Sequence, residues 1–270
     1  MIKLFRNIRK NLLNEGKTTK YLKYAIGEIV LVVIGILIAL SINNWNSNRI
    51  KHQKESLYLS NIQRDLEEQL ISIKQQMAFE FEIIKAAKPI IIYYKTNHEF
   101  RVDSVFTATI AKLTARMTFV KNNPTYIELL SSGNINIISN DGLKNELIKY
   151  YQEMERIEQV INKNNNLFTD AVFVPEMLKL TEIQSTDLYE RNMFQGILSD
   201  IPAEISTDIV SLNEDNLKEI TRLNLQIPEK HLFMINAVNF KYQLAIIHYR
   251  LLNKQKIKTQ ELLNKLKTKD

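Results

Sequence analysis

The sequence predicts an all-α protein, with one transmembrane helix followed by an extracytoplasmic antiparallel helical bundle whose first and last helices are long. Glycine and proline are scarce, at 6 and 5 of 270 residues, which disfavours turn-rich β-sandwiches and barrels and favours long helices. Residues 24–43 form an apolar run long enough to cross a bilayer. Beyond residue 50, apolar side chains recur every three or four positions, the period of a helix with one buried face.

The composition excludes several other classes of protein. Hydrophobic residues make up 45% of the chain, an ordinary share that argues against several membrane spans. The chain has no cysteine, which excludes a disulfide framework, a thiol nucleophile and a cysteine-ligated zinc site. Cysteine usage leaves the compartment open, because a chain without cysteine suits both reducing and oxidising surroundings.

The positive charge is concentrated at the N-terminus. The first 23 residues hold seven Lys or Arg and only Glu15 on the acidic side, a net charge of +6, and the whole chain is also +6. The rest of the chain is therefore balanced. Because a nucleic-acid-binding domain carries its own basic face, we expect no nucleic-acid partner. A basic tail beside an apolar helix is instead typical of membrane topology.

The apolar run extends from Tyr24 to Ile42 and contains one charged residue, Glu28. At 1.5 Å per residue, its length matches the ~30 Å hydrocarbon core of a bilayer. The sequence therefore predicts three parts: a basic cytoplasmic tail (1–23), a transmembrane helix (24–43) and an extracytoplasmic helical domain (44–270).

The flanking charges orient the span. Only Arg49, Lys51 and Lys54 follow it closely, against the seven basic residues before it, so the N-terminus is expected in the cytoplasm. This predicts a single-pass protein of the inner (cell) membrane with a periplasmic C-terminal domain. A cleaved signal peptide is the alternative, since Ala39-Leu40-Ser41 resembles a cleavage site, but the apolar run exceeds the usual h-region.

Several residues are expected to contact lipid or another helix in the membrane. The expected membrane-interface residues are Arg6, Arg9, Lys10, Lys20, Lys23 and Trp45. The tail is read either as an amphipathic helix lying on the inner leaflet or as a disordered topology signal. Gly35 and Ala39 are spaced to let a second helix approach closely. Glu28 fits either an interfacial carboxylate or a partner contact.

Two long helices are expected in the domain after the span. The first covers residues 50–95, with an apolar stripe of Leu59, Ile62, Leu66, Leu70, Ile73, Met77, Phe81 and Ile84. The last covers residues 229–267, with an inward stripe of Phe233, Ala237, Phe240, Leu244, Ile247, Leu251, Leu262 and Leu266. Each stripe needs a partner surface, which predicts a bundle.

Shorter helices are expected between the long ones. One is predicted at about 103–120, and another begins at Asn123-Pro124 and is closed by Gly133. A helix capped by residues 139–141 runs to about residue 165, with a stripe of Leu143, Leu147, Tyr150, Tyr151, Met154, Ile157 and Ile161. Residues 166–212 are expected to be irregular, and a helix follows at 214–225.

Two stretches carry a resemblance to a known family: KYAIGEIVLVVIGILIALSINNWNSNR (23–49) and PTYIELLSSGNINIISNDGLKNELIKYY (124–151). They resemble an uncharacterised bacterial family of single-pass membrane proteins, domain of unknown function 6090. Ser41 departs from the Gln expected before Ile42-Asn43-Asn44-Trp45. The resemblance implies a Gram-negative inner-membrane location with the bulk of the chain in the periplasm. It implies no activity, so it assigns no catalytic residue.

No motif for catalysis, a cofactor or a metal is recognised in the sequence. The four histidines, His52, His98, His231 and His248, lack metal-binding spacing. Gly16-Lys17-Thr18 resembles the end of a phosphate-binding loop, but position 11 is Asn and no strand precedes it. We therefore expect neither an enzyme nor a cofactor.

One polar corner is specific enough to be a candidate binding site: Tyr126, Ser131, Ser132, Gly133 and Asn134. The simpler explanation of these residues is a helix terminator whose polar groups satisfy the turn. A ligand- or partner-binding corner is the functional alternative.

The expected function is a membrane-anchored helical interaction module, namely a scaffold, an assembly factor or a sensor input. Its expected partners are the lipid bilayer and either another protein or further copies of the chain, bound through helices. The alternative is a small-molecule-binding domain with a pocket between bundle helices near Tyr150, Phe168 and Phe240.

Overall fold

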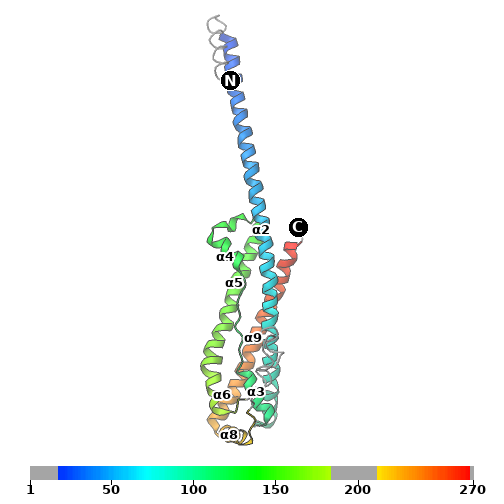
Figure 1. Ribbon diagram of the computed structural model, residues 1–270, viewed down its shortest axis with the longest axis vertical. Helices are drawn as coiled ribbons and strands as arrows, with labels where there is room; N and C mark the ends of the chain where they lie inside the picture. Colours follow the sequence, from blue (N-terminus) through cyan, green and yellow to red (C-terminus); the bar gives the residue numbers. More distant parts are fainter. Residues whose placement is uncertain (1–17, 184–211, 268–270) are drawn as a thin grey trace, which may run out of the picture. The chain divides into compact units, whose positions relative to one another are not determined.

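The computed structural model describes residues 18–183 and 212–267, and every regular element among them is helical (Figure 1). The chain divides into two compact units, Met1–Tyr58 and Leu59–Asp270, which we describe separately. The first helix, α2 (Thr18–Asn97), begins in one unit and ends in the other. Of the predicted membrane-interface residues, Arg6, Arg9 and Lys10 lie outside the described part.

In the first unit, α2 is apolar and exposed. Its most apolar 18-residue window has a mean hydropathy of 2.8, and none of that window is buried. Large side chains such as Ile29, Leu31 and Leu37 are more than half exposed. Among the described residues, this is the one helix whose length and composition would let it cross a membrane.

In the second unit, shorter helices follow α2. Their bounds are α3 (Ser104–Leu113), α4 (Pro124–Ser131), the 3₁₀ helix η1 (Asn134–Ile137), α5 (Asp141–Asn164), the π-helix η2 (Asn165–Phe173), α6 (Val174–Leu180), α8 (Asp215–Gln226) and α9 (Pro228–Lys267). Local sequence features explain where some of these helices begin and end. Asn140 caps α5 by accepting a hydrogen bond from the Leu143 amide, and Gly133 follows α4 with φ 70°.

The helix α9 packs antiparallel to both α2 and α5, beside which it lies in Figure 1. Along α2, its partners run from Glu67 (paired with Lys267) to Tyr94 (bonded to His231). Along α5, they run from Glu146 (paired with Lys265) to Asn164 (beside His248). Since α9 is antiparallel to both, α5 runs in the same direction as the part of α2 within the second unit.

The buried faces of α2 and α9 follow an alternating spacing of four and three residues, as in left-handed helix packing. In α2 the buried positions that follow this spacing are Ile62, Leu66, Gln69, Ile73, Gln76, Glu80, Ile83 and Ala87. In α9 they are Met234, Val238, Lys241, Ala245, His248, Leu252, Gln255, Thr259, Leu262 and Leu266, and Ala237, Leu244 and Leu263 are buried beside them. Polar side chains thus occupy part of each inward face.

The predicted stripes of the long helices are wrong at three positions. Phe81, Phe240 and Ile247 are exposed, at 50%, 49% and 46%. They are displaced from the core because the inward positions beside them are taken by polar residues such as Glu80 and Lys241. The predicted stripe of α5 is correct at all seven positions, each of which is buried.

The helix predicted at 103–120 is too long. The α-helix α3 ends at Leu113, and residues 115–123 form no regular element. We call residues 115–123 the strap. Its buried side chains, Ala115 and Phe119, alternate with the exposed Arg116, Thr118 and Val120, so it packs one side against the bundle and leaves the other open to solvent.

The segment after α5 was predicted to be irregular, yet the chain stays helical through η2 and α6 to Leu180. The helix predicted at 214–225 is confirmed as α8, and the last helix as α9. Asn123 precedes α4 as predicted, but its side chain forms no capping hydrogen bond.

Candidate functional site

The strap is held by side chains of the surrounding helices. A buried segment without helical or sheet pairing leaves its backbone N–H and C=O groups in need of partners. Asn162 of α5 supplies two of them, because its Nδ2 donates to the Phe119 carbonyl (2.9 Å) and its Oδ1 accepts from the Phe119 amide (3.2 Å). Glu158, one turn earlier, accepts from the Lys121 amide (3.0 Å) and pairs with the Lys121 ammonium.

The other helices contact the strap in the same way. From α2, Gln69 accepts from the Asn122 amide, and Gln76 Nε2 lies 3.4 Å from the Met117 carbonyl. Lys241 of α9 donates to the Ala115 carbonyl (3.2 Å). Several of the polar residues on the inward faces therefore form hydrogen bonds to the backbone of the strap.

A second buried group, Glu80 with His248, continues this network. Glu80 Oε1 lies 3.1 Å from His248 Nδ1 and accepts a hydrogen bond from Gln76 Nε2 (2.9 Å). The other ring nitrogen, Nε2, lies 3.0 Å from Asn164 Nδ2. With the amide donating to Nε2, the imidazole proton sits on Nδ1 and faces the carboxylate.

Lys241 is the most unusual member of the network, since only 5% of it is exposed. Besides Ala115, its ammonium donates to Thr169 Oγ1 of the π-helix (2.9 Å). Burial lowers the pKa of Lys241 to about 8, and the nearby carboxylates of Glu80 and Asp170 oppose that shift. A lysine of this kind can act as a nucleophile or a base where a substrate can reach it.

Three surface grooves formed by the described residues do not reach these groups. One lies along Lys85–Asn97 of α2, one between η2 and α9 at Phe168 and Phe240, and one around Trp45. Lys241, Glu80 and His248 line none of the three. Perturbed groups also occur in structural networks, and the contacts of this cluster join its members to the strap and to one another.

The residues of the predicted binding corner lie in different surroundings. Tyr126 is buried and stacks on Tyr151, with ring centroids 4.3 Å apart, and burial raises its pKa. Ser131 and Ser132 are exposed, and both hydroxyls donate to the Glu128 carbonyl, at 3.2 and 2.6 Å. With Gly133 at φ 70°, this is the geometry of a helix terminator, and Asn134 begins the 3₁₀ helix that follows.

The predicted pocket near Tyr150, Phe168 and Phe240 is divided. Phe168 and Phe240 meet edge to face, with centroids 4.6 Å apart, and both line an open groove. The Tyr150 hydroxyl instead lies 2.9 Å from Thr259 Oγ1, and burial raises the pKa of Tyr150. Phe240 and Thr259 are separated by roughly 28 Å along α9, so Tyr150 is not part of that groove.

The predicted membrane residues that the structure describes lie in α2. Lys23 is exposed, and the side chain of Lys20 is outside the described part. Trp45 is 63% exposed, with the Arg49 guanidinium 5.4 Å from its ring centroid. Gly35 has no heavy atom within 4 Å of an added Cβ, and Ala39 is exposed, so this face is open to a second helix.

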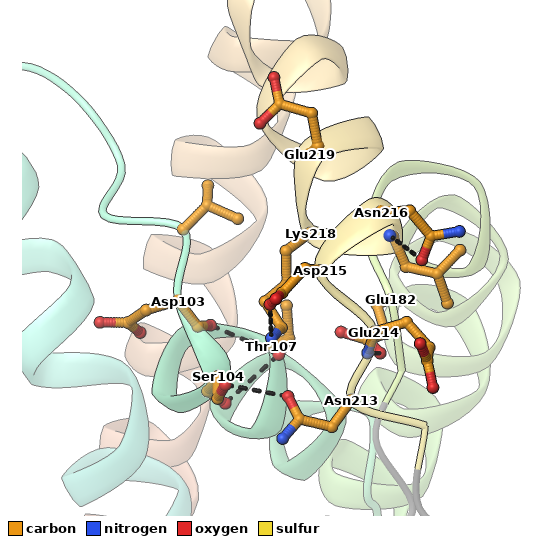
Figure 2. A network of polar contacts seen from close by, with 12 residues as sticks. Asp103, Ser104, Thr107, Glu182, Asn213, Glu214, Asp215, Asn216, Lys218 and Glu219 are labelled. Atoms are coloured by element: carbon orange, nitrogen blue, oxygen red, sulfur yellow. Dashed lines mark hydrogen bonds and ion pairs between the residues drawn. The ribbon is translucent and has the colours of Figure 1, made fainter.

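A further polar network, missed by the sequence analysis, joins α3, α8 and the segment after α6 (Figure 2). Ser104 donates to Asn213 Oδ1 (2.9 Å), and buried Glu182 accepts from the Glu214 amide (3.0 Å). Lys218 pairs with Asp215 beside them (2.8 Å). These contacts fix the residues on either side of positions 184–211. No group of three metal-ligating side chains occurs among residues 18–183 and 212–267.

No curated protein and no solved structure matches the chain. A family model does match, over residues 28–171, and its description is a family of unknown function (DUF6090). The matched region extends from the apolar segment of α2 through the strap to the π-helix. It covers more than half of the chain, so this protein belongs to the DUF6090 family.

Proposed function

We propose that this protein is a membrane-anchored interaction module, working as a scaffold, an assembly factor or a sensor input without catalysis. Its N-terminus lies in the cytoplasm and its helical bundle lies in the periplasm, on the outer side of the inner membrane. The observation that supports this most is the exposed apolar segment of α2, of mean hydropathy 2.8.

The orientation rests on charge. Seven basic residues precede the apolar segment, and the positive-inside rule keeps such a flank in the cytoplasm. The balanced charge of the remaining chain suits a domain that binds other proteins better than one that binds nucleic acid.

We propose that the protein is not an enzyme because its buried polar side chains are engaged in hydrogen bonds within the bundle. Lys241 and Asn162 donate to carbonyl groups of the strap, and Glu80 accepts from Gln76, which also contacts the strap. The groove at Phe168 and Phe240 is open to solvent, whereas small-molecule sites usually enclose most of their ligand. A small-molecule receptor is therefore the weaker alternative.

The membrane anchor is tested by charged substitutions in the apolar segment. Arg at the centre of a span disfavours insertion by about 2.5–3.5 kcal/mol each, so Ile34→Arg with Leu37→Arg should move the protein from the membrane to the soluble fraction. The matched control, Ile34→Leu with Leu37→Ile, should stay with the membrane. A double-Arg variant that remains in alkali-washed membranes would contradict the anchor.

The interaction role is tested by crosslinking in intact cells with an amine-reactive reagent, followed by mass spectrometry. Scaffolds and sensor inputs are expected to give crosslinks to a partner or to a second copy. A chain that stays monomeric and captures nothing, while crosslinks within the bundle form efficiently, would contradict this proposal.

A further inference from the structure

One exposed face of α2 carries apolar and basic side chains but no acidic one. Between residues 71 and 95, exposed positions recur at alternating intervals of three and four residues, so their side chains form a continuous row along the helix. Half of these residues are apolar and half are lysine. We call this set the lysine face: Ile71, Lys74, Ala78, Phe81, Lys85, Lys88, Ile92 and Lys95.

The lysine face lies away from the core of the bundle. The buried positions of α2 also alternate by four and three residues, so the exposed row keeps a constant angle to the buried one. Ile71 and Ile92 lie on the side of α2 opposite to the buried row, yet they are 58% and 54% exposed. The side of a helix that faces solvent normally carries polar residues. Large apolar side chains aligned there indicate a surface that another molecule covers.

The lysines of this face are available to a partner. Lys85 pairs with Glu82 (3.0 Å) and lies over the Phe81 ring. In the described part of the chain, no carboxylate pairs with Lys74, Lys88 or Lys95. The negative charge that would match these ammonium groups must therefore come from another molecule.

The neighbouring helix α9 does not supply that charge. It packs beside the lysine face through Tyr249, whose ring centroid lies 6.4 Å from that of Phe81. Between residues 230 and 260, α9 contains no Asp or Glu. A groove along Lys85–Asn97 covers the second half of the face and is lined by Lys88 and Ile92.

We propose that the lysine face binds an acidic amphipathic helix of another protein. This inference rests on the proposed role as an interaction module and names the class of partner. The partner helix packs apolar side chains against Ile71, Phe81 and Ile92, because two helices that pack side by side match apolar positions three and four residues apart. Its carboxylates meet the lysines between them. The face is roughly 36 Å long, enough for a partner helix of about 24 residues.

Other occupants match the face less well. Two copies anchored in one membrane would pair in parallel and place lysine against lysine. A nucleic acid would pair with the lysines but leave Ile71, Phe81 and Ile92 in water. A helix that lies on a lipid surface separates its apolar side chains from its charges, whereas both kinds are mixed along this row.

The test measures binding of a designed helix to the full-length protein in detergent. The probe is a fluorescent peptide of about four heptads with Leu at positions a and d and Glu at positions e and g, where the Glu residues discourage peptide dimers. Fluorescence anisotropy gives the dissociation constant. A control peptide with Lys in place of each Glu should bind at least about tenfold more weakly. No binding of the Glu peptide, or equal affinity of the two peptides, would overturn the proposal.

Charge reversal locates the binding on this face. Lys74→Glu with Lys88→Glu should weaken binding of the Glu peptide by about tenfold, because attractive pairs become repulsive. The matched control is Lys149→Glu with Lys163→Glu, two exposed lysines equally far apart on α5, which should change the affinity by less than about twofold. Equal losses in the two variants would indicate a general effect of net charge and overturn the assignment to α2.

The apolar part of the face is tested separately. Ile71→Ser with Ile92→Ser should also weaken binding of the Glu peptide by about tenfold, because less apolar surface is removed from water. Both side chains are exposed, so circular dichroism should show the same helix content as in the wild type. An unchanged affinity would mean that charge alone attracts the peptide, and the proposed helix packing would be wrong.

A lipid surface is separated from a protein helix by a vesicle assay. The full-length protein in phosphatidylcholine nanodiscs is mixed with phosphatidylglycerol vesicles, and cosedimentation is measured. The proposal expects no binding. Vesicle binding that the Lys74→Glu, Lys88→Glu variant loses would overturn it in favour of lipid. Failure of the interaction role itself is distinguished by the intact-cell crosslinking above, which can capture a partner through another surface even if this face binds no peptide.

Discussion

Asn162 illustrates how single polar residues hold this bundle together. Its carboxamide bonds both the N–H and the C=O of Phe119, as a neighbouring β-strand would. The strap can therefore pack in an extended conformation against the helices without a sheet. Sequence patterns could not predict this, because an Asn within a helix is read as a surface residue and Phe119 as part of a longer helix.

Replacing Asn162 with Leu should destabilise the protein strongly. The two Phe119 backbone groups would lose their partners in a part-buried site, so we expect a loss of about 2–4 kcal/mol in the free energy of unfolding. Chemical denaturation of the full-length protein in detergent measures it. The control is Gln159→Leu, an exposed residue on the same helix, which should change the stability by less than about 0.5 kcal/mol. Equal effects of the two substitutions would contradict the role of Asn162.

Lys241 makes the stability depend on pH. Its folded-state pKa of about 8 lies below the ordinary value of 10.5, so between these values the unfolded chain binds the extra proton. The free energy of unfolding therefore increases with pH between about pH 8 and pH 10.5, by up to about 3 kcal/mol. Below about pH 8 Lys241 is protonated in both states, and this gain is lost.

The test compares the wild-type protein with Lys241→Met at intervals from pH 7 to pH 10. The stability difference, wild type minus variant, should increase as pH rises. The comparison is needed because burial raises the pKa of Tyr150 and Tyr151, which lowers the stability of both proteins above about pH 10. A difference that is constant or decreases with pH would show that Lys241 is not buried as a charged group.

At the scale of elements, the positions of most helices could be predicted, but the buried faces of the two longest could not. The bounds of α8 and α9 follow from Pro228 and from the apolar spacing on either side. The inward face of α9 contains Lys241, His248, Gln255 and Thr259, which a search for apolar stripes passes over. In α5 the inward face is entirely apolar, apart from the tyrosine hydroxyls, and there the prediction is correct.

The turn after α4 contains most of the candidate binding corner, and substitutions there test the helix-terminator explanation. Gly133 has φ 70°, so Gly133→Ala should destabilise the protein by about 1 kcal/mol, and Gly133→Asn by less, because Asn tolerates this conformation better. Ser131→Ala should have little effect, since the Ser131 hydroxyl is exposed and bonds only the Glu128 carbonyl. Thermal melts rank the three variants. A neutral Gly133→Ala would contradict the helix-terminator assignment.

At the scale of the whole molecule, the all-α class and the single apolar segment were predictable from scarce glycine and proline and from residues 24–43. The family was also recognisable, because the GEIVLVVIGILIAL core followed by NNWN is distinctive. The path of the strap and the polar cluster of Glu80 and His248 were not. These depend on contacts between residues 37 to 168 positions apart, which local patterns do not encode.

The central claim is that the bundle is anchored by one span and lies outside the cytoplasm. Fusion of alkaline phosphatase after Asp270 tests it most directly, because that enzyme is active only when exported, and a green fluorescent protein fusion at the same site provides the converse control. We predict an active phosphatase and a dark fluorescent protein. An inactive phosphatase at full expression, together with a bright fluorescent protein, would contradict the account.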